Sequence, residues 1–261
     1  VKGIQRLQRI EQRGPGVNTR SLPCTFVGLM TPLRKLFAET RLAKARGYSP
    51  GRFSLNKRGG RCEACEGLGQ IRIQLDFMPD VVAPCHVCEG RRYNFETLQA
   101  TWKGRSIADV FALSAEEALE LFQAHPEIGD RLRLMTELGL DYLQLGQPFS
   151  TLSGGELQRL KLVAELAKTS QLPTLYVLDE PSRGLHPYDV AKLIRILQRL
   201  VDAGHSVWVI EHNRDLLLSC DWLVELGPEG GPSGGELIFE GRPTEIARGT
   251  TATGKALAIE S

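Results

Sequence analysis

Two short runs, the first ending at Glu156 and the second beginning at Thr174, constrain the fold of this chain most strongly. The first, Leu152-Ser153-Gly154-Gly155-Glu156, places small residues directly before an amphipathic segment. This arrangement predicts a helix start whose bare backbone amides suit a phosphate group. The second run, from Thr174 to Pro181, is apolar and β-rich and then delivers two carboxylates. It predicts a buried strand that places Asp179 and Glu180 at the edge of a sheet.

The residues that follow continue as alternating helices and strands. A helix is predicted from about 187 to 203, with Leu193, Leu197 and Leu200 on one face. Val207-Trp-Val-Ile210 predicts a second buried strand, which leads into Glu211-His212. Further strand candidates cover 222–226 and 237–240. Alternation at this spacing indicates an α/β fold with a mostly parallel sheet.

The order of these motifs resembles an ATP-binding-cassette (ABC) ATPase, in which a signature motif precedes the Walker B strand. By that resemblance, Asp179 holds Mg²⁺, usually through water, and Glu180 orients and polarises the attacking water. His212, at the end of the next strand, is placed near the γ-phosphate. A strand-end histidine is by itself more often structural, but the two preceding motifs favour a functional role here.

The signature run implies a site shared between two nucleotide-binding domains. By the same resemblance, Ser153, Gly154, Gly155 and Glu156 face a nucleotide held by the opposite domain. The run from Ser182 to His186 corresponds to the D-loop, which crosses the dimer interface in ABC proteins. The cofactors implied for the complete protein are ATP and Mg²⁺.

The Walker A loop, Gly-x-x-x-x-Gly-Lys-Ser/Thr, has no full match in the sequence. The nearest run, Gly249 to Ala256, lacks the hydroxyl that binds Mg²⁺, and it stands last where ABC proteins place the loop first. We therefore expect a catalytically incomplete ATP site, with the missing part upstream of Val1. A start at Val1 instead of Met agrees with a fragment of something longer.

Four cysteines have the spacing of a structural zinc site. Cys62-x-x-Cys65 and Cys85-x-x-Cys88 each form a knuckle that presents two thiolates, and four sulfurs close a tetrahedron. Glycines at 67, 69 and 90 permit the tight turns. The alternative is a set of unmetallated core or redox cysteines. His86 is expected to face solvent, and the isolated Cys24 and Cys220 are expected to be buried thiols.

Charge is distributed unevenly along the chain. Residues 1–105 carry 19 Lys/Arg and 8 Asp/Glu, whereas residues 106–261 carry 13 and 23. The basic half indicates an anionic partner, nucleic acid before membrane, although a solvated basic face is the alternative. Cations with exposed rings (Phe53, Tyr93 and Trp102) suit a phosphate backbone and unstacked bases. The predicted DNA-binding residues are Arg52, Lys57, Arg58, Arg61, Arg91 and Arg92.

The knuckles by themselves resemble the repeats of J-domain chaperones, but the downstream ATPase motifs disfavour a chaperone. Knuckles placed ahead of an ABC signature, together with the runs Gly51–Cys65, Leu145–Glu156, Val209–Asn213 and Leu226–Gly231, resemble the C-terminal portion of the bacterial excinuclease component UvrA and its family. The resemblance covers roughly residues 10–245 and implies the second of two cassettes, or a UvrA-like paralogue.

This resemblance carries further expectations. It gives the Q-loop role to Gln12 and implies a cytoplasmic bacterial protein that dimerises on damaged double-stranded DNA. A UvrB-type partner would bind through the missing N-terminal half. Arg183 departs from the commonest family form, which is uncharged at that position, so the D-loop is expected to behave differently.

The predicted fold class is α/β, an ABC-type ATPase domain lacking its Walker A part, with an inserted small zinc-binding and helical signature domain. The predicted segments are 1–40 (Q-loop), 41–105 (Cys₄ zinc module, DNA-binding), 106–150 (helical signature segment) and 151–261 (signature, Walker B, D-loop and H-loop).

Three functions follow from these patterns. The first is a DNA-damage-recognition ABC ATPase of nucleotide excision repair. The second is a non-catalytic DNA-binding and dimerisation fragment. The third is the ATPase component of another ABC system such as a transporter, although transporter cassettes rarely place a Cys₄ knuckle module before the signature. No apolar run approaches the roughly 18 residues that a membrane helix needs.

Overall fold

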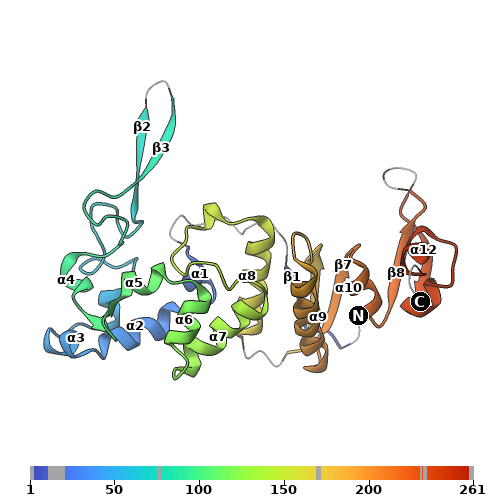
Figure 1. Ribbon diagram of the computed structural model, residues 1–261, viewed down its shortest axis with the longest axis horizontal. Helices are drawn as coiled ribbons and strands as arrows, with labels where there is room; N and C mark the ends of the chain where they lie inside the picture. Colours follow the sequence, from blue (N-terminus) through green and yellow to red (C-terminus); the bar gives the residue numbers. More distant parts are fainter. Residues whose placement is uncertain are drawn as a thin grey trace. The chain divides into compact units, whose positions relative to one another are not determined.

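The computed structural model describes residues 3–10, 21–75, 78–168, 172–229, 231 and 234–258 (Figure 1). The chain divides into two compact units, one formed by residues 1–11 with 171–261 and the other by residues 12–170. Among the described residues, no helix is both long and apolar enough to cross a membrane. These unit boundaries differ from the four segments expected from the sequence, because the helix after the signature run lies in the 12–170 unit.

A three-stranded parallel sheet forms the centre of the first unit. Its order is β1-β6-β7, with β1 at Arg6–Ile10, β6 at Thr174–Asp179 and β7 at Ser206–Ile210. Helix α9 (Pro187–Asp202) connects β6 to β7 and contacts β7. The strands and the helix predicted from the sequence are thus confirmed, as is the parallel arrangement.

The two faces of this sheet differ in exposure. Tyr176 and Leu178 of β6 are buried, and α9 buries five apolar side chains along one side. On the other face, Leu7 of β1 and Trp208 and Ile210 of β7 are 57%, 67% and 62% exposed. Parallel sheets are normally covered on both faces. The described part of the chain therefore leaves one face of its parallel sheet uncovered.

The C-terminal part of the same unit is a hairpin with short helices. Strands β8 (Leu223–Gly227) and β9 (Glu236–Gly241) pair antiparallel, close to the expected positions. Leu223, Ile246 and Leu257 form a small buried cluster there. The helices of this part are α10 (Arg214–Ser219), α11 (Pro243–Ile246) and α12 (Ala252–Ala258).

The second unit is mainly helical, and its helix starts follow the local sequence. Ser106 and Ser114 form capping boxes with Asp109 and Glu117, three residues further on, and Pro126 opens the next helix. The helices are α1 (Pro23–Phe26), α2 (Met30–Ala38), α3 (Arg41–Ala45), α4 (Phe95–Leu98), α5 (Ile107–Ala112), α6 (Ala115–Leu121), α7 (Pro126–Glu137) and α8 (Gly154–Leu166), with 3₁₀ turns at Pro50–Phe53 and Phe149–Thr151.

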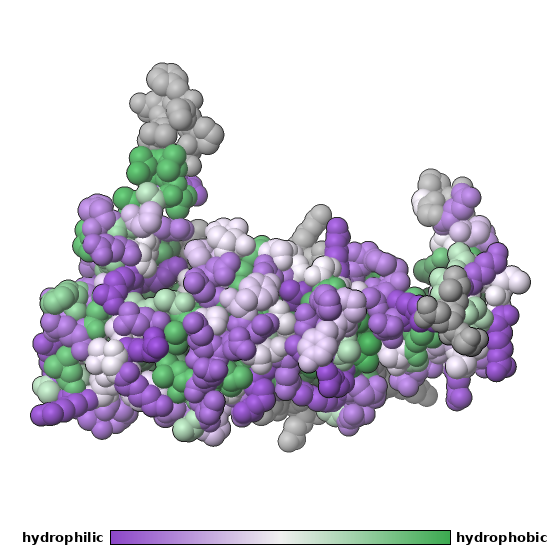
Figure 2. All heavy atoms as spheres, viewed as in Figure 1, coloured by the Kyte–Doolittle hydropathy of each residue, from purple (hydrophilic) through white to green (hydrophobic). Residues whose placement is uncertain are grey.

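Two hairpins complete this unit. Strands β2 (Gln70–Leu75) and β3 (Met78–Pro84) pair antiparallel and project from the cysteine-containing region (Figure 1). Ile73, Val81 and Val82 expose apolar surface on this hairpin, seen as green atoms below its grey tip in Figure 2. The short pair β4 (Thr101–Trp102) and β5 (Arg105–Ser106) forms the second hairpin.

The structure corrects four expectations about side-chain exposure. Phe53 and Tyr93 are buried instead of exposed, because Phe53 packs on Phe37 of α2 and Tyr93 packs on Phe111 of α5. Trp102 is half-buried and stacks on Phe122, with ring centroids 5.0 Å apart. Cys24 is buried as expected, whereas Cys220 is only half-buried.

Candidate functional site

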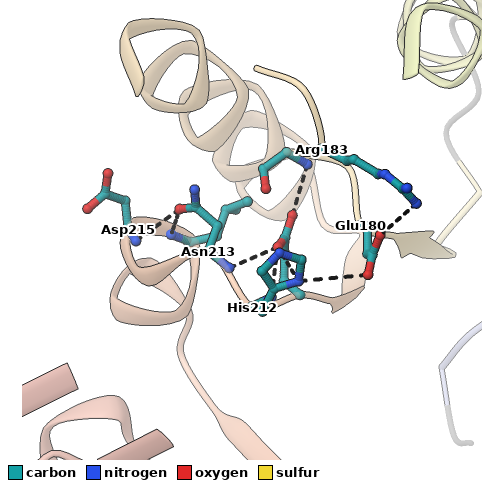
Figure 3. A network of polar contacts seen from close by, with 8 residues as sticks. Glu180, Arg183, His212, Asn213 and Asp215 are labelled. Carbon is teal, nitrogen blue, oxygen red and sulfur yellow. Dashed lines mark hydrogen bonds and ion pairs between the residues drawn. The ribbon is translucent and has the colours of Figure 1, made fainter. Parts of the chain in front are cut away.

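The carboxyl end of β6 lies beside that of β7 and brings three predicted site residues together. The Glu180 amide donates to the Ile210 carbonyl over 2.8 Å, which extends the pairing of the strands beyond Asp179. His212 Nδ1 lies 3.7 Å from Glu180 Oε1 (Figure 3). The Asp179 side chain is exposed at the same edge. The predicted Mg²⁺ ligand, water-polarising carboxylate and histidine thus share one open edge.

Glu180 is held in an unusual way. Its backbone has a φ of +43°, a left-handed conformation that non-glycine residues rarely adopt. Strain of this kind recurs at functional sites where the surrounding structure fixes the backbone. Arg183 Nη1 approaches Glu180 Oε2 at 3.3 Å, so the carboxylate lies between a guanidinium and an imidazole. Arg183, which departs from the commonest family form, therefore forms an ion pair with Glu180.

Glu211, between β7 and His212, has a buried carboxylate. Its Oε1 accepts from the Ser182 amide at 2.9 Å, and its Oε2 accepts from the His212 and Asn213 amides at 2.8 and 2.9 Å. Burial raises the pKa of this carboxyl, but the hydrogen bonds from Ser182, Asn213 and His212 outweigh it and hold the pKa below its usual value.

The signature run forms the N-terminus of α8, as predicted. Ser153 is the N-cap, and its hydroxyl accepts from the Glu156 amide at 3.3 Å, while Glu156 Oε2 accepts from the Ser153 amide at 2.6 Å. Ser153 and Gly154 are exposed and Gly155 is half-buried. Exposed backbone at a helix start is suited to an anion.

Tyr142 adds an interaction with this motif that the sequence does not reveal. Its hydroxyl donates to Glu156 Oε1 at 2.6 Å. Burial raises the pKa of Glu156, but hydrogen bonds from Tyr142 and Ser153 lower it by more than burial raises it, so the net shift is downward. The capping carboxylate is therefore held in its charged form. The spacing of Tyr142 and Glu156 in the sequence does not predict this contact, because it is the conformation of the loop between α7 and α8 that brings the two residues together.

The four knuckle cysteines converge as expected. Cys62, Cys65, Cys85 and Cys88 are buried, and all four sulfurs lie within 4.8 Å of one another. The Cys62–Cys85 and Cys65–Cys88 sulfurs are 3.9 and 3.6 Å apart. Four sulfurs about 2.3 Å from a tetrahedral zinc lie about 3.8 Å from each other. The donor set and its dimensions therefore fit zinc, and His86 is exposed beside it.

Two of the predicted DNA-binding arginines are used inside the fold. The Arg61 side chain is 7% exposed and lies 3.3 Å from Glu63 and 3.8 Å from Glu66. Arg92 is 8% exposed, and its guanidinium donates to the carbonyls of Leu68, Gly146 and Gly67 at 2.6, 3.2 and 3.4 Å. Arg92 thus joins a cysteine knuckle to the loop that precedes the signature run.

The other four basic residues divide into two kinds. Arg52 Nε donates to the Thr97 hydroxyl at 2.8 Å, and its guanidinium lies over the Tyr48 ring. Arg91 is exposed but pairs with Asp109 at 3.0 Å. Lys57 and Arg58 are exposed in the turn between the 3₁₀ segment and the first knuckle. These two are the cations of the set most open to a partner.

Two further sequence predictions concern the Q-loop residue and the near match to a Walker A loop. Gln12 lies outside the described residues. The near match at Gly249–Ala256 follows helix α11 and runs into α12, with Gly254 buried inside the helix. A phosphate-binding loop joins a strand to a helix, so this segment lacks the required context.

Comparisons with known proteins agree with the motifs. UvrABC system protein A of Thermus thermophilus is 51% identical over 261 residues, which is 99% of this chain and 27% of the relative. The protein of the same name from Aquifex aeolicus is 50% identical over 258 residues, 98% of this chain and 28% of the relative. The chain therefore spans little more than a quarter of these relatives.

A solved structure gives the same result. The crystal structure of UvrA2 from Deinococcus radiodurans matches with a TM-score of 0.90 and 47% identity, over 98% of this chain and 32% of that one. A scan against models of protein families finds no match. The resemblance to the UvrA family, or to a UvrA-like paralogue, is confirmed.

Proposed function

We propose, from the chain's correspondence to part of a UvrA protein, that it is the second cassette of a DNA-damage-recognition ABC ATPase of nucleotide excision repair. The observation that carries this proposal is the shared edge of Asp179, Glu180 and His212, in a chain half identical to UvrABC system protein A. The complete protein would use ATP binding and hydrolysis to rearrange its dimer on DNA.

Each residue of this edge would have a role in phosphoryl transfer. Asp179 would hold Mg²⁺, and Glu180 would orient the attacking water, with His212 beside it to meet the γ-phosphate. Ser153, Gly154, Gly155 and Glu156 would bind the nucleotide of the opposite domain through the helix start.

The chain by itself would be catalytically incomplete. It carries no complete phosphate-binding loop in its sequence, and one face of its parallel sheet is uncovered in the described residues. Polypeptide that supplies a Walker A loop would also cover Leu7, Trp208 and Ile210. The alternative is a non-catalytic module that binds DNA and dimerises, and the absence of a Walker A match favours it for the chain in isolation.

The cysteine cluster would hold one structural Zn²⁺. All four positions of a tetrahedron are taken by sulfur, which leaves no open position for chemistry. Gly67 and Gly69 have φ values of +80° and +75°, and an added Cβ would meet backbone oxygens at 2.6 and 2.8 Å. The knuckles therefore depend on these glycines and on the metal together.

DNA would contact the basic region of the 12–170 unit through its phosphates. Lys57 and Arg58 are exposed candidates, while the half-buried Arg52 and the exposed Arg91, which pairs with Asp109, could add contacts. Arg61 and Arg92 would act indirectly by holding the module in shape. Phosphate contacts carry no base sequence, which suits a protein that reads damage through deformability.

Partners follow from the same family. We propose a dimer on damaged duplex DNA in the bacterial cytoplasm, with a UvrB-type protein bound through the part of the relatives that this chain does not cover.

The experiment that tests the function measures ATP hydrolysis by the intact protein and by its Glu180→Gln variant. Turnover should fall about 100-fold or more, because the carboxylate that polarises water is lost, while ATP binding is kept. Glu240→Gln on exposed β9 is the matched control and should hydrolyse ATP normally. Undiminished turnover in Glu180→Gln would mean that the site is misassigned.

A further inference from the structure

The Glu211 carboxylate links two segments that each carry one group of the proposed hydrolytic site. Ser182 follows Glu180 by two residues, at the start of the D-loop, whereas His212 directly follows Glu211. One oxygen of Glu211 accepts from the first segment, and the other accepts twice from the second. Figure 3 shows this network around Glu180 and His212.

The burial of this carboxylate shows that its three hydrogen bonds are needed. The Glu211 side chain is 1% exposed, and a buried charge is costly unless hydrogen bonds replace its water. Three backbone amides supply that replacement. Burial raises the pKa of Glu211, but a hydrogen bond from the Ser182 side chain, together with those from the three amides, favours the charged form and shifts the pKa downward.

These hydrogen bonds bear on the distance between the side chains of His212 and Glu180. His212 and Glu180 approach each other at 3.7 Å, although they leave different strands. The Asn213 side chain accepts from the amides of Asp215 and Leu216 at 3.0 and 3.3 Å, so the second segment is anchored to α10 as well. The first segment has the Arg183 amide bonded to the Glu180 carbonyl within its own turn.

We propose that Glu211 is a positioning residue that clamps the D-loop start to the His212 segment and thereby sets the distance between Glu180 and His212. This inference rests on the proposed hydrolytic function, to which it adds a role for a residue that touches neither nucleotide nor metal. Because one oxygen serves each segment, loss of either oxygen should release one segment while the strands stay paired.

Glu211→Gln is the sharpest variant, because it keeps the volume and one acceptor oxygen. Its amide nitrogen cannot accept a hydrogen bond, so the N–H groups of one segment would face another donor. In the intact protein, we expect kcat for ATP hydrolysis to fall about 10- to 100-fold while KM for ATP changes less than about threefold, since the group orients catalytic residues without binding substrate. Glu211→Asp, which is one methylene shorter, should also lose kcat.

Controls separate this inference from the function on which it depends. Glu240→Gln should behave as wild type. If Glu180→Gln abolishes turnover but Glu211→Gln keeps wild-type kcat, the clamp is overturned and the hydrolytic function stands. If Glu180→Gln retains turnover, the proposed function fails instead. A fall in kcat together with a rise in KM and a fall in melting temperature would indicate a merely structural carboxylate and overturn the positioning role.

A second measurement covers the case in which Glu211→Gln does not fold. Hydrogen exchange of the intact wild-type protein reports on the amides of Ser182, His212 and Asn213 directly. Slow exchange at all three, relative to exposed amides of the same loops, supports the clamp. Rapid exchange at Ser182 together with His212 would overturn it.

Discussion

Replacement of Arg92 tests whether this residue stabilises the fold or binds DNA. Arg92→Met keeps most of the side-chain volume but removes three hydrogen bonds from a guanidinium that is 8% exposed. A hydrogen bond to a charged group contributes about 1.5–3 kcal/mol. The three bonds share one cation, and those to Gly146 and Gly67 are long, at 3.2 and 3.4 Å. We therefore expect a loss of about 3 kcal/mol in the free energy of unfolding of this unit.

Urea unfolding followed by Trp102 fluorescence measures this loss. Trp208 and Trp222 lie in the other unit and are 67% and 59% exposed, so Trp208→Phe with Trp222→Phe leaves Trp102 as the reporter. With an m value of about 2 kcal/mol/M, the midpoint should fall by about 1.5 M urea. The urea midpoint of Arg92→Lys should lie between those of the wild type and Arg92→Met, because an ammonium cannot reproduce the guanidinium fork.

The exposed pair Lys57 and Arg58 provides the matched contrast. Lys57→Ala with Arg58→Ala should leave the urea midpoint nearly unchanged, since surface changes usually stay within about 0.5 kcal/mol. It should weaken DNA binding and reduce the salt slope by up to about 2, one for each phosphate that is no longer neutralised. A normal midpoint in Arg92→Met, with a reduced salt slope, would refute the bracing role and restore Arg92 as a DNA-binding residue.

Three further outcomes are expected. Elemental analysis should find about one zinc per chain and much less in Cys62→Ser, because structural zinc needs all four sulfurs; equal zinc in both would contradict the site. Tyr142→Phe should lower the melting temperature by only a few degrees, about 1 kcal/mol or less, since Tyr142 is 57% exposed and the Ser153 cap remains. The pKa values of Asp109, Glu156 and Glu211 all lie below their usual range, so their contribution to stability should be complete above about pH 5 and lost as the pH falls through the folded-state values. A stability that is flat from about pH 6 to about pH 3 would contradict this last expectation.

The sequence predicts local structure here because the relevant signals are short-range. The apolar run before Asp179 gives a strand, the serine caps at Ser106 and Ser114 give helix starts, and the cysteine spacing gives the cluster of four sulfurs. Each strand, cap and knuckle depends on residues only a few positions apart, so composition and periodicity are sufficient.

What the sequence does not reveal depends on interactions between distant segments. Arg92 is buried because it meets a carbonyl 54 residues away, and nothing in its neighbours distinguishes it from the exposed Arg58. Tyr93 is buried for a similar reason, since its hydroxyl donates to the Phe53 carbonyl. Glu211 stands in a recognised run, but its role becomes visible only when the Ser182 amide is seen to face it.

The measurement that tests the central claim most directly is the binding of the intact protein to two duplexes of identical sequence, one carrying a bulky lesion. With ATP present, we predict tighter binding to the damaged duplex, with similar salt slopes for the two because the phosphate contacts are shared. Equal affinity for both duplexes at every salt concentration, with and without ATP, would contradict a role in damage recognition.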